Sequence, residues 1–253
     1  MARPLDGKVA LVTGASSGIG RATSLAFAAN GAKVVAADIN ATEGEETVRQ
    51  IRDAGGEARY IHCDVSLAAE VSRLVAETVQ TFGRLDAAHN NAGVEGIRVP
   101  LTEMSEENWD RVQAVNLKGV WLCMKYEIPQ MLRQGGGAIV NTSSVAGLIG
   151  MKGSAAYGSA KHGVVGLTKT AALEFATRGV RINAVCPGAI RTPMTERLMG
   201  HDLEREAMYM SIQPIGRFGT TQEIAEAVVW LCSDAASLVT GVAMPVDGGI
   251  MAH

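Results

Sequence analysis

The stretch Lys8-Val-Ala-Leu-Val-Thr-Gly-Ala-Ser-Ser-Gly-Ile-Gly20 decides the fold of this chain. Residues 8–12 form a short apolar run typical of a β-strand, and residues 21–30 have the composition of a helix that stops at Gly31. A strand, a glycine-rich turn and a helix in this order are the context that a phosphate-binding turn requires. The stretch therefore predicts a βα unit whose helix N-terminus receives a dinucleotide pyrophosphate.

The three glycines of this turn have separate expected tasks. Gly14 permits the tight turn, Gly18 lets the backbone approach the pyrophosphate, and Gly20 lets the helix pack closely on the strand. The amide groups and the dipole at a helix N-terminus favour anions at that place. A glycine triplet alone is weak support for a nucleotide site, so the prediction depends on the residues that follow it.

An acidic residue follows the glycine turn at the distance that a dinucleotide site requires. Asp38 ends the apolar run of residues 33–37, about 20 residues past the glycines, where a carboxylate binds the adenosine ribose hydroxyl groups. The same carboxylate would repel a 2′-phosphate, and Ser17 stands where an NADP-binding protein could use a basic residue. We therefore expect NAD rather than NADP. The alternative for Asp38 is a helix N-cap or a turn residue.

Strands and helices alternate through the rest of the chain. Further strands are expected at residues 58–63, 85–89, 138–142, 180–185 and 242–246, and helices at residues 42–54, 68–82, 106–131, 155–177, 194–212 and 221–231. This alternation predicts an α/β fold, a doubly wound parallel sheet (Rossmann fold) of about seven strands with helices on both faces. Without a repeat or a linker, residues 1–253 are expected to form a single domain.

Composition and charge disfavour several kinds of protein. The chain has 253 residues, is 47% hydrophobic and carries a net charge of −3, so nucleic acid and anionic membranes are poor partners. No uncharged apolar run reaches transmembrane length, and the first residues lack the apolar segment of a signal peptide. The four cysteines are far apart and not in metal-ligand spacing. They predict reduced thiols, no metal site and a cytoplasmic protein.

A second motif, Tyr157-Gly-Ser-Ala-Lys161, indicates a reaction. Four residues apart on a helix, Tyr157 and Lys161 lie on one face. The ammonium is expected to lower the phenol pKa from about 10 toward working pH and so make an acid/base for an alcohol or a ketone. Ser144, after an expected strand, can hydrogen-bond a substrate oxygen as it gains charge. Most such tyrosine–lysine pairs are ordinary solvated helix faces, so the motif needs a hydride carrier beside it.

Polar residues at two further strand ends and within one helix are candidates for the same site. Asp64-Val65 ends the third expected strand, where ligands of open α/β sheets bind. Asn90-Asn-Ala-Gly93 turns off the fourth, either as plain turn chemistry or as a brace for a cofactor loop. Asn116 falls inside an expected helix, which is unfavourable unless its amide is used. The alternative interpretation of Asn116 is a polar side chain that faces water.

Together these motifs resemble the short-chain dehydrogenase/reductase family, in its branch of chains of this length. The matching stretches run in the family's order, with Ser144 thirteen residues before Tyr157, and cover nearly the whole chain. They are Thr13–Gly20, Asp38, Asp64-Val65, Asn90–Gly93, Asn116, Ser144, Tyr157, Lys161 and Pro187–Thr192. The resemblance implies a seven-stranded doubly wound fold, usually a homotetramer, and NAD(P)-dependent oxidation of alcohols or reduction of ketones.

The resemblance also implies a role for each matching residue. Tyr157 would be the acid/base, Lys161 would lower its pKa and hold the nicotinamide ribose, and Ser144 would orient the substrate oxygen. Asn116 would hold a water that links the lysine to solvent. The expected cofactor contacts are Gly14, Ser16, Ser17, Gly18, Ile19, Gly20, Asp38, Ile39, Asp64, Val65, Asn90, Ala92, Gly93, Tyr157, Lys161, Pro187, Gly188, Ile190 and Thr192.

The substrate pocket is expected to come from residues after Ser144 and from a loop at about 193–213. Its candidates are Ser144, Ala146, Met151, Tyr157, Met194, Leu198 and Met199. Methionine adapts to irregular apolar shapes, although these methionines could equally belong to a helix core. The segments CMKYEI, IRTPM and PIGRF resemble those of family members that act on cyclic alcohols and diols.

The expected function is therefore NAD-dependent interconversion of a secondary alcohol, a cyclic alcohol or diol among the candidates, and a ketone, in a homotetramer. A 3-oxoacyl-thioester reductase is the main enzymatic alternative, although it would usually require NADP and a basic entrance, which Asp38 disfavours. A nucleotide-sugar epimerase would need an added substrate domain. A non-catalytic NAD-binding regulator would not need the set of Ser144, Tyr157 and Lys161.

Overall fold

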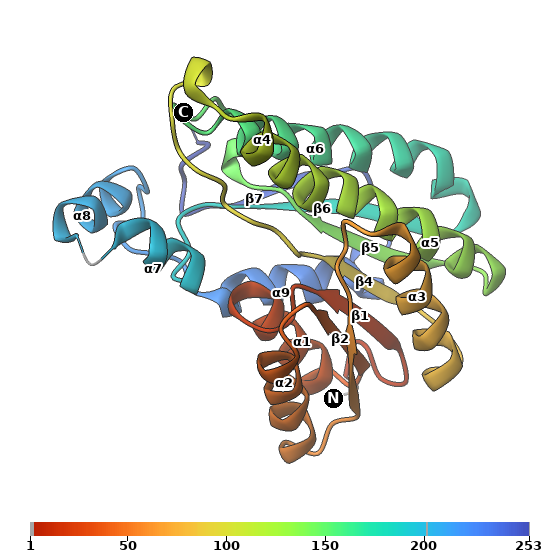
Figure 1. The fold of residues 1–253 in the computed structure, drawn as a ribbon. Coiled ribbons are helices and arrows are strands. Elements are labelled where there is room, and N and C mark those ends of the chain that lie inside the picture. The colour runs from red at the N-terminus through yellow and green to blue at the C-terminus, as the bar shows by residue number, and fades with distance from the viewer. Residues whose placement is uncertain (1–2, 201, 253) are drawn as a thin grey trace.

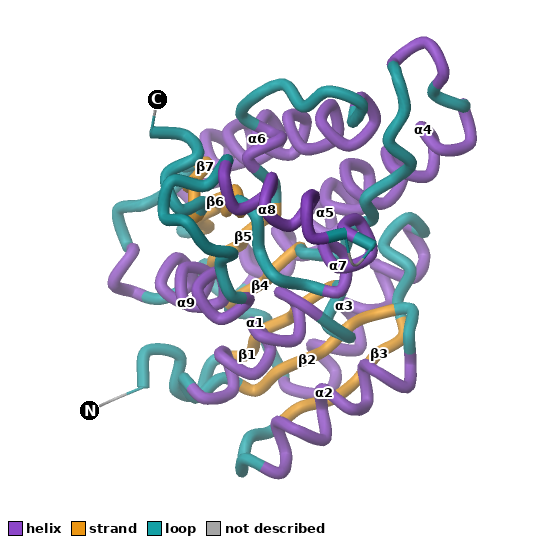
Figure 2. The backbone as a smooth tube through the Cα atoms, turned by 90° about the vertical axis from the view of Figure 1, so that its left-hand side faces the viewer, coloured by secondary structure: helices purple, strands orange, loops and turns teal. Residues whose placement is uncertain are grey.

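Seven parallel strands form the centre of the computed structural model, which describes residues 3–200 and 202–252. They are β1 (Val9–Thr13), β2 (Lys33–Asp38), β3 (Ala58–His62), β4 (Ala87–Asn90), β5 (Gly137–Thr142), β6 (Val180–Pro187) and β7 (Ala243–Val246). Their spatial order is β3-β2-β1-β4-β5-β6-β7, so the chain reverses its direction across the sheet between β1 and β4 (Figure 2). The predicted doubly wound parallel sheet is confirmed, and its switch point is where such sheets bind ligands.

Helices cover both faces of this sheet (Figure 1). On one face lie α1 (Gly18–Ala29), α2 (Ala41–Asp53) and α9 (Thr221–Cys232); on the other lie α3 (Ala68–Phe82), α5 (Gly119–Arg133) and α6 (Ala155–Phe175), with α4 (Glu106–Gln113) packed on α6. Short 3-10 turns occur at η1 (Leu101–Glu103), η3 (Val145–Gly147), η4 (Ala176–Arg178) and η5 (Asp234–Ala236). The remaining helices, α7 (Pro193–Met199) and α8 (Leu203–Ser211), stand outside both layers.

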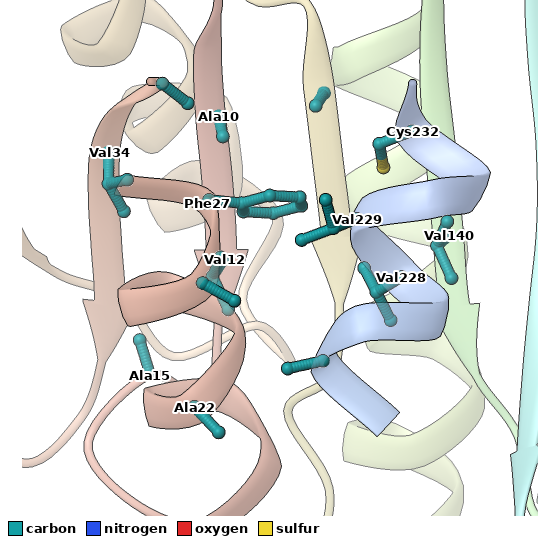
Figure 3. Packing of buried hydrophobic residues seen from close by; sticks show 14 of the residues in the cluster. Ala10, Val12, Ala15, Ala22, Phe27, Val34, Val140, Val228, Val229 and Cys232 are labelled. Atoms are coloured by element: carbon teal, nitrogen blue, oxygen red, sulfur yellow. The ribbon is translucent and has the colours of Figure 1, made fainter. Parts of the chain in front are cut away.

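Successive strand residues feed two separate cores, because side chains alternate across a sheet. In β1, Val12 packs in the core under α1 and α9, whereas Leu11 packs in the core under α3, α5 and α6. Phe27 of α1 is fully buried and points toward Val229 of α9 (Figure 3). Both faces of the central strands are therefore apolar, as expected for a parallel sheet covered by helices.

The helix expected at 106–131 contains a π-helical turn. This turn, η2 (Ala114–Lys118), joins α4 to α5 and carries Asn116, which is fully buried. The Asn116 amide accepts from the backbone N–H of Val94 and donates to the Val94 carbonyl oxygen, both at 2.8 Å. The sequence prediction missed the π turn, a feature that often marks a functional position in a helix.

The single helix expected at 194–212 is wrong, because α7 and α8 are separate helices. Gly200 has a φ of 61°, and a glycine in this left-handed conformation ends α7. Asp202 then caps α8 through its side chain. His201, also within the expected helix, lies outside the described residues. None of the helices in residues 3–200 and 202–252 has the length and apolar character needed to cross a membrane.

A buried carboxyl group lies between the sheet and α5. Glu127 is fully buried and accepts a hydrogen bond at 3.0 Å from Asn90 Nδ2, which also donates to Asn141 Oδ1 at 3.0 Å. The second carboxyl oxygen of Glu127 has no partner among the described residues. Because burial disfavours the charged form, the pKa of Glu127 is raised to about 7, against which the hydrogen bond from Asn90 acts weakly.

We expect this carboxyl group to make the stability of the protein fall as pH rises. The folded state holds a proton on Glu127 up to about pH 7, whereas the unfolded chain releases it near 4.5. The contribution of protonated Glu127 to the free energy of unfolding is therefore fully present below pH 4.5. It is lost between pH 4.5 and 7, by about 3 kcal/mol at 1.4 kcal/mol per pKa unit. Glu127→Gln, which keeps the shape of the neutral acid, should abolish this loss.

Urea unfolding between pH 5 and pH 8, at one protein concentration, would measure the effect. Glu174→Gln, an exposed change at the end of α6, is the matched control and should keep the wild-type pH dependence. Parallel pH curves for wild type and Glu127→Gln would show that Glu127 is ionised throughout this range.

Candidate active site

The glycine turn joins β1 to α1 with the geometry of an anion cradle. Gly14 and Gly18 have φ angles of 66° and 53°, in the left-handed region that favours glycine. A Cβ atom on Gly20 would lie 2.0 Å from the carbonyl oxygen of Gly14, so only glycine lets the helix approach the turn this closely. Ser17 precedes α1 without capping it through its side chain, which leaves the first amides of the helix available to a phosphate.

One cavity of about 490 Å³ extends along the carboxyl ends of the strands from Asp38 to Tyr157. Its size is within the range of small-molecule sites. The cofactor residues expected from the sequence that line it are Gly14, Ser16, Ser17, Gly18, Ile19, Asp38, Ile39, Asp64, Val65, Ala92, Gly93, Tyr157, Lys161, Pro187, Gly188, Ile190 and Thr192. Gly20 and Asn90 do not line it, and Gly20 acts through the close packing described above.

Asp38 lies at the carboxyl end of β2, held by two backbone amides. Its Oδ2 accepts from the N–H of Ser16 at 3.0 Å, and its Oδ1 accepts from the N–H of Asn40 at 2.9 Å. These bonds fix the carboxylate against the glycine turn before any ligand arrives. At the end of β3, Asp64 Oδ1 accepts from the backbone and the hydroxyl of Ser66, at 2.9 and 2.7 Å.

Asn90 is a core residue rather than a cofactor contact, which corrects the sequence prediction. Its side chain is 1% exposed and bonds to Glu127 and Asn141 beneath α5. Side chains alternate along a strand, so Asn90 and the next residue point to opposite faces of the sheet. It is therefore Asn91, named from the sequence only as part of the Asn90–Gly93 turn and its alternative role as a brace, that lines the cavity.

Asn91 ties together the ends of three strands. Its Nδ2 donates to the carbonyl oxygens of Thr13 (3.1 Å) and Gly14 (3.3 Å), so its Oδ1 must accept, and it does so from the Thr142 hydroxyl at 3.3 Å. That hydroxyl in turn accepts from His89 Nε2 at 2.8 Å. His89 is therefore a neutral imidazole with its hydrogen on Nε2, in agreement with burial, which lowers its pKa to about 3.

The three expected catalytic side chains meet at the far end of the cavity. Lys161, 3% exposed, donates from Nζ to the carbonyl oxygen of Thr142 at 2.8 Å and lies 5.6 Å from the centre of the Tyr157 ring. The Ser144 hydroxyl is within hydrogen-bond reach of Tyr157 and also accepts from the N–H of Ala146 at 3.1 Å. A substrate oxygen could thus meet the phenol and the Ser144 hydroxyl together.

Burial sets the protonation of this group before a cofactor binds. It raises the pKa of Tyr157, and the hydrogen bond with Ser144 and the positive charge of Arg98 oppose it only in part. It lowers the pKa of Lys161 to about 8. The expected lowering of the phenol pKa by Lys161 is therefore not met in the protein alone. A cationic nicotinamide ring beside the phenol would favour the phenolate.

Asn116 supports the site from the π turn. Its amide is fully engaged with the backbone of Val94, on the chain segment that follows β4. Its Oδ1 would lie 3.3 Å, and Lys161 Nζ 3.7 Å, from a Cβ atom placed on Gly93, so both flank the same glycine. The side chain therefore holds the wall of the cavity next to the lysine, and a water relay through Asn116 remains a proposal from the resemblance.

The substrate end of the cavity is only partly as expected. Of the candidates from the sequence, Ser144, Tyr157 and Met194 line the cavity, whereas Ala146, Met151, Leu198 and Met199 do not. Ala146 is fully buried, and Met199 packs under α7 with Ala189 and Phe218. Residues that line the cavity without having been predicted as cofactor or substrate contacts are Asn40, Cys63, Asn91, Val94, Val115, Thr142, Ser143, Pro193, Thr195 and Arg197.

The chain is similar to a family of known reductases and to individual dehydrogenases. Residues 14–251 match the family model described as enoyl-(acyl carrier protein) reductase. A 2,5-dichloro-2,5-cyclohexadiene-1,4-diol dehydrogenase of Sphingobium indicum is 48% identical over 249 residues, covering 98% of each chain. Cyclohexanol dehydrogenase of an Acinetobacter species is 46% identical over 248 residues, 98% of this chain and 96% of that one.

Solved structures show the same fold. That of levodione reductase is 40% identical and superimposes with a TM-score of 0.94 over 97% of this chain and 98% of that chain. A protein from Beutenbergia cavernae, solved with NADP at low occupancy, is 38% identical and has a TM-score of 0.94 over 100% of both chains. These similarities support a nicotinamide cofactor without distinguishing NAD from NADP.

We expect Tyr157→Phe to fold and bind NADH but to lose turnover of secondary alcohols. The ring remains, so packing changes little, whereas the lost proton transfer corresponds to about 10²–10⁴-fold in rate. NADH fluorescence titration and steady-state rates would separate the two effects. Tyr126→Phe, on α5 and partly buried against the core, is the matched control and should retain activity. A Tyr157→Phe rate above a third of wild type would remove Tyr157 from the acid/base role.

Proposed function

The chain belongs to the short-chain dehydrogenase/reductase family, and from its site we propose that it interconverts a secondary alcohol and a ketone with NAD. A cyclic alcohol or diol is the proposed substrate. The observation that carries the proposal is the meeting of Ser144, Tyr157 and Lys161 at one end of a cavity whose other end has a dinucleotide cradle. The relatives named above, with ring diols and cyclohexanol as substrates, support the substrate class.

The residues of the cavity suit a dinucleotide. The pyrophosphate would lie at the free amides of α1, where Gly18 leaves room for a close approach of the backbone. Asp38 would accept from the adenosine ribose hydroxyls, since its carboxylate is already oriented by two amides. Lys161 would hold the nicotinamide ribose. When bound, the nicotinamide supplies hydride chemistry, which no amino-acid side chain offers.

Proton transfer is the task of the protein itself. In alcohol oxidation the Ser144 hydroxyl and the Tyr157 phenolate would hold the substrate oxygen, and Tyr157 would take its proton. Ser144 would stabilise the charge that develops on that oxygen. Lys161 is fixed by the Thr142 carbonyl, so its ammonium would favour the phenolate without moving during the reaction. In ketone reduction the same phenol would return the proton.

Activity on a panel of secondary alcohols, followed as NADH absorbance, is the direct test. The proposal predicts oxidation of cyclohexanol and of 1,2-cyclohexanediols. A 3-oxoacyl-thioester reductase, the second candidate because a protein of that name is also similar to this chain, would instead reduce an acetoacetyl thioester. Among the described lining residues, Lys161 and Arg197 are the only basic ones, which gives little attraction for an acidic carrier protein. A purely regulatory NAD-binding protein would bind NADH and oxidise none of the alcohols.

Two further properties are part of the proposal. We propose an oligomer of identical chains, since an apolar groove lined by Leu117, Trp121 and Leu167 lies on the outer side of α5 and α6. The resemblance points to a tetramer. We also propose a cytoplasmic location, because the four cysteines are free and buried, as suits a reducing compartment.

Light scattering would test the oligomer. Trp121 is 43% exposed in the single chain, and we expect Trp121→Glu to place a charge in the contact and lower the mass at micromolar concentrations. Trp109→Glu, on α4 and outside the groove lining, is the control. A wild-type mass of about 26.5 kDa would contradict the oligomer.

The proposed preference for NAD over NADP depends on Asp38. Carboxylate and 2′-phosphate at about 4 Å would repel by about 2–4 kcal/mol, on the order of 30- to 1000-fold in kcat/KM. No lysine or arginine of the described residues lines the adenosine end, and Arg21, behind the turn, is paired with Glu43 at 2.7 Å. We therefore expect wild type to prefer NAD by at least about 30-fold.

Asp38→Ser with Ile39→Arg should narrow or reverse this preference, because the repulsion is removed and a phosphate partner is added. Ile39 is 65% exposed at the cavity, so the arginine has room. The measurement is kcat/KM for NAD and NADP with one alcohol, on wild type, each single variant and the double variant. Equal use of both cofactors by wild type would overturn the assigned role of Asp38.

A further inference from the structure

The backbone that follows β6 passes beyond the end of its neighbouring strand. β6 pairs with β7 as far as Pro187 and Val246, and the N–H of Gly188 still donates to the Val246 carbonyl oxygen at 3.1 Å. Residues 248–249 then turn the chain away from β6, and both glycines have positive φ angles. The next residue along β6 is Ala189, which is 7% exposed. Its buried N–H and carbonyl groups therefore need partners within the protein.

One buried side chain takes the place of the missing strand. Gln213 follows α8 and is 2% exposed, and its Oε1 accepts from the N–H of Ala189 at 2.8 Å. Its Nε2 donates to the carbonyl oxygens of Ala189 at 3.4 Å and of Arg217 at 2.5 Å. Because an N–H only donates and a carbonyl oxygen only accepts, these bonds fix the orientation of the amide. The Ala189 carbonyl has a second donor in the N–H of Gly219, at 2.9 Å, whereas the Ala189 N–H is held by Gln213.

The side chain of Gln213 fits closely between two turns of backbone. A Cβ atom on Gly188 would lie 2.6 Å from its Oε1, and a Cβ atom on Gly248 would lie 2.7 Å from its Cγ. A side chain without the amide would leave the Ala189 N–H buried and unpaired, which costs more than a hydrogen bond normally contributes. Gln213 therefore holds the backbone of residues 188–190 in one position.

The segment that Gln213 holds lines the catalytic end of the cavity. The two neighbours of Ala189, Gly188 and Ile190, are both lining residues. Their strand, β6, lies beside β5, whose last residue Thr142 holds Lys161 through its carbonyl oxygen. The adenosine end, at β2, lies on the other side of β1 and β4 in the sheet. A dinucleotide that reaches from one end to the other would therefore bring its nicotinamide to residues 187–192.

A second contact reaches the same segment from α7. The Thr195 hydroxyl donates to the Ile190 carbonyl oxygen at 2.7 Å. Thr195 and Gln213 stand at the two ends of the excursion made by α7 and α8, which lies outside both helix layers (Figure 1). Both ends of this excursion are thus fastened to Ala189 and Ile190, so the segment is held from two sides.

We propose that Gln213 is a positioning residue for the nicotinamide half of the cofactor. Gln213 does not line the cavity, and it acts through residues 188–190, against which the nicotinamide would bind. The inference rests on the proposed function, because it requires a nicotinamide dinucleotide. At the other end of the cavity, the glycine turn and Asp38 have hydrogen bonds of their own. Loss of Gln213 should therefore impair binding of the nicotinamide and spare the adenosine and the pyrophosphate.

Two ligands separate the halves of the site. ADP-ribose has the adenosine, the pyrophosphate and both riboses of NADH but no nicotinamide, so the ratio of the two Kd values isolates the nicotinamide contribution. Calorimetry would measure both on wild type and on Gln213→Met, which keeps the length of the side chain and removes its hydrogen bonds. We expect NADH to bind about 5- to 50-fold more weakly, in the range that one buried unpaired donor costs, and ADP-ribose to change by less than about twofold.

Gln213→Glu is the second variant. It keeps the volume and the acceptor for Ala189 but removes both donors, and it should change the ratio in the same direction.

Gln134 offers a matched control at the opposite end of the sheet. Its Oε1 accepts from the N–H of Leu85 at 3.1 Å, and its Nε2 donates to the Leu85 carbonyl oxygen at 2.5 Å. Gln134→Met thus removes the same kind of contact from a residue that does not line the cavity. Urea unfolding should show a loss of stability similar to that of Gln213→Met, while the ratio of the Kd values stays at its wild-type value. A purely structural role for Gln213 would make the two variants alike in both measurements.

An unchanged ratio in both Gln213 variants, or an equal change in Gln134→Met, would overturn the proposal. So would a wild type that binds NADH no more tightly than ADP-ribose. In each of these cases the protein still binds the dinucleotide, and only this inference fails. If wild type binds neither NADH nor NADPH, the proposed function fails as well, and the two failures are thereby distinguished.

Discussion

The structure depends on the hydrogen bonds of one amide at the switch point of the sheet. Asn91 follows β4 and binds the carbonyl oxygens that end β1 as well as the hydroxyl that ends β5. The first contact fixes the glycine turn, and the second fixes Thr142, whose own carbonyl oxygen holds Lys161. A single side chain thus sets the position of the glycine turn relative to Lys161. Because His89 and Thr142 complete the chain of donors and acceptors, the amide cannot rotate without leaving buried groups unpaired.

Charge is divided along the cavity that this arrangement creates. Among the described lining residues, the carboxylates of Asp38 and Asp64 lie at the end formed by β2 and β3, and the basic residues Lys161 and Arg197 lie at the other. Burial works against the charged form of both Tyr157 and Lys161 in the protein alone. A cationic nicotinamide beside the phenol would reverse that tendency for Tyr157, so the acid/base would become active only once the cofactor is in place.

Buried polar residues on the other face of the sheet fix strands and helices against one another. Asn90, Asn141 and Thr168 form a chain of hydrogen bonds that begins at Glu127. An apolar core would be simpler to pack, but these groups fix β4 and β5 against α5 and α6 in one register. The cost is a carboxyl group that resists ionisation. These hydrogen bonds lie on the face of β4 that does not touch the cavity. They still contribute to the geometry of the cavity, because they fix the positions of β4 and β5, which lead to Asn91 and Thr142.

Much of the fold and of the dinucleotide site was determined by local sequence patterns. Gly14, Gly18 and Gly20 act through their own backbone freedom and lack of a Cβ atom, and Asp38 acts through its place at a strand end, so each could be read without knowing its neighbours. The pair Tyr157 and Lys161 is likewise fixed by the pitch of one helix.

Other features arise between segments distant in sequence, and only the tertiary structure decided them. The choice between Asn90 and Asn91 depends on which side of β4 faces the core. The substrate end could not be predicted in full because Val94, Val115 and Met194 come from separate loops and helices, and their meeting is set by packing, which leaves no periodic signal in the sequence.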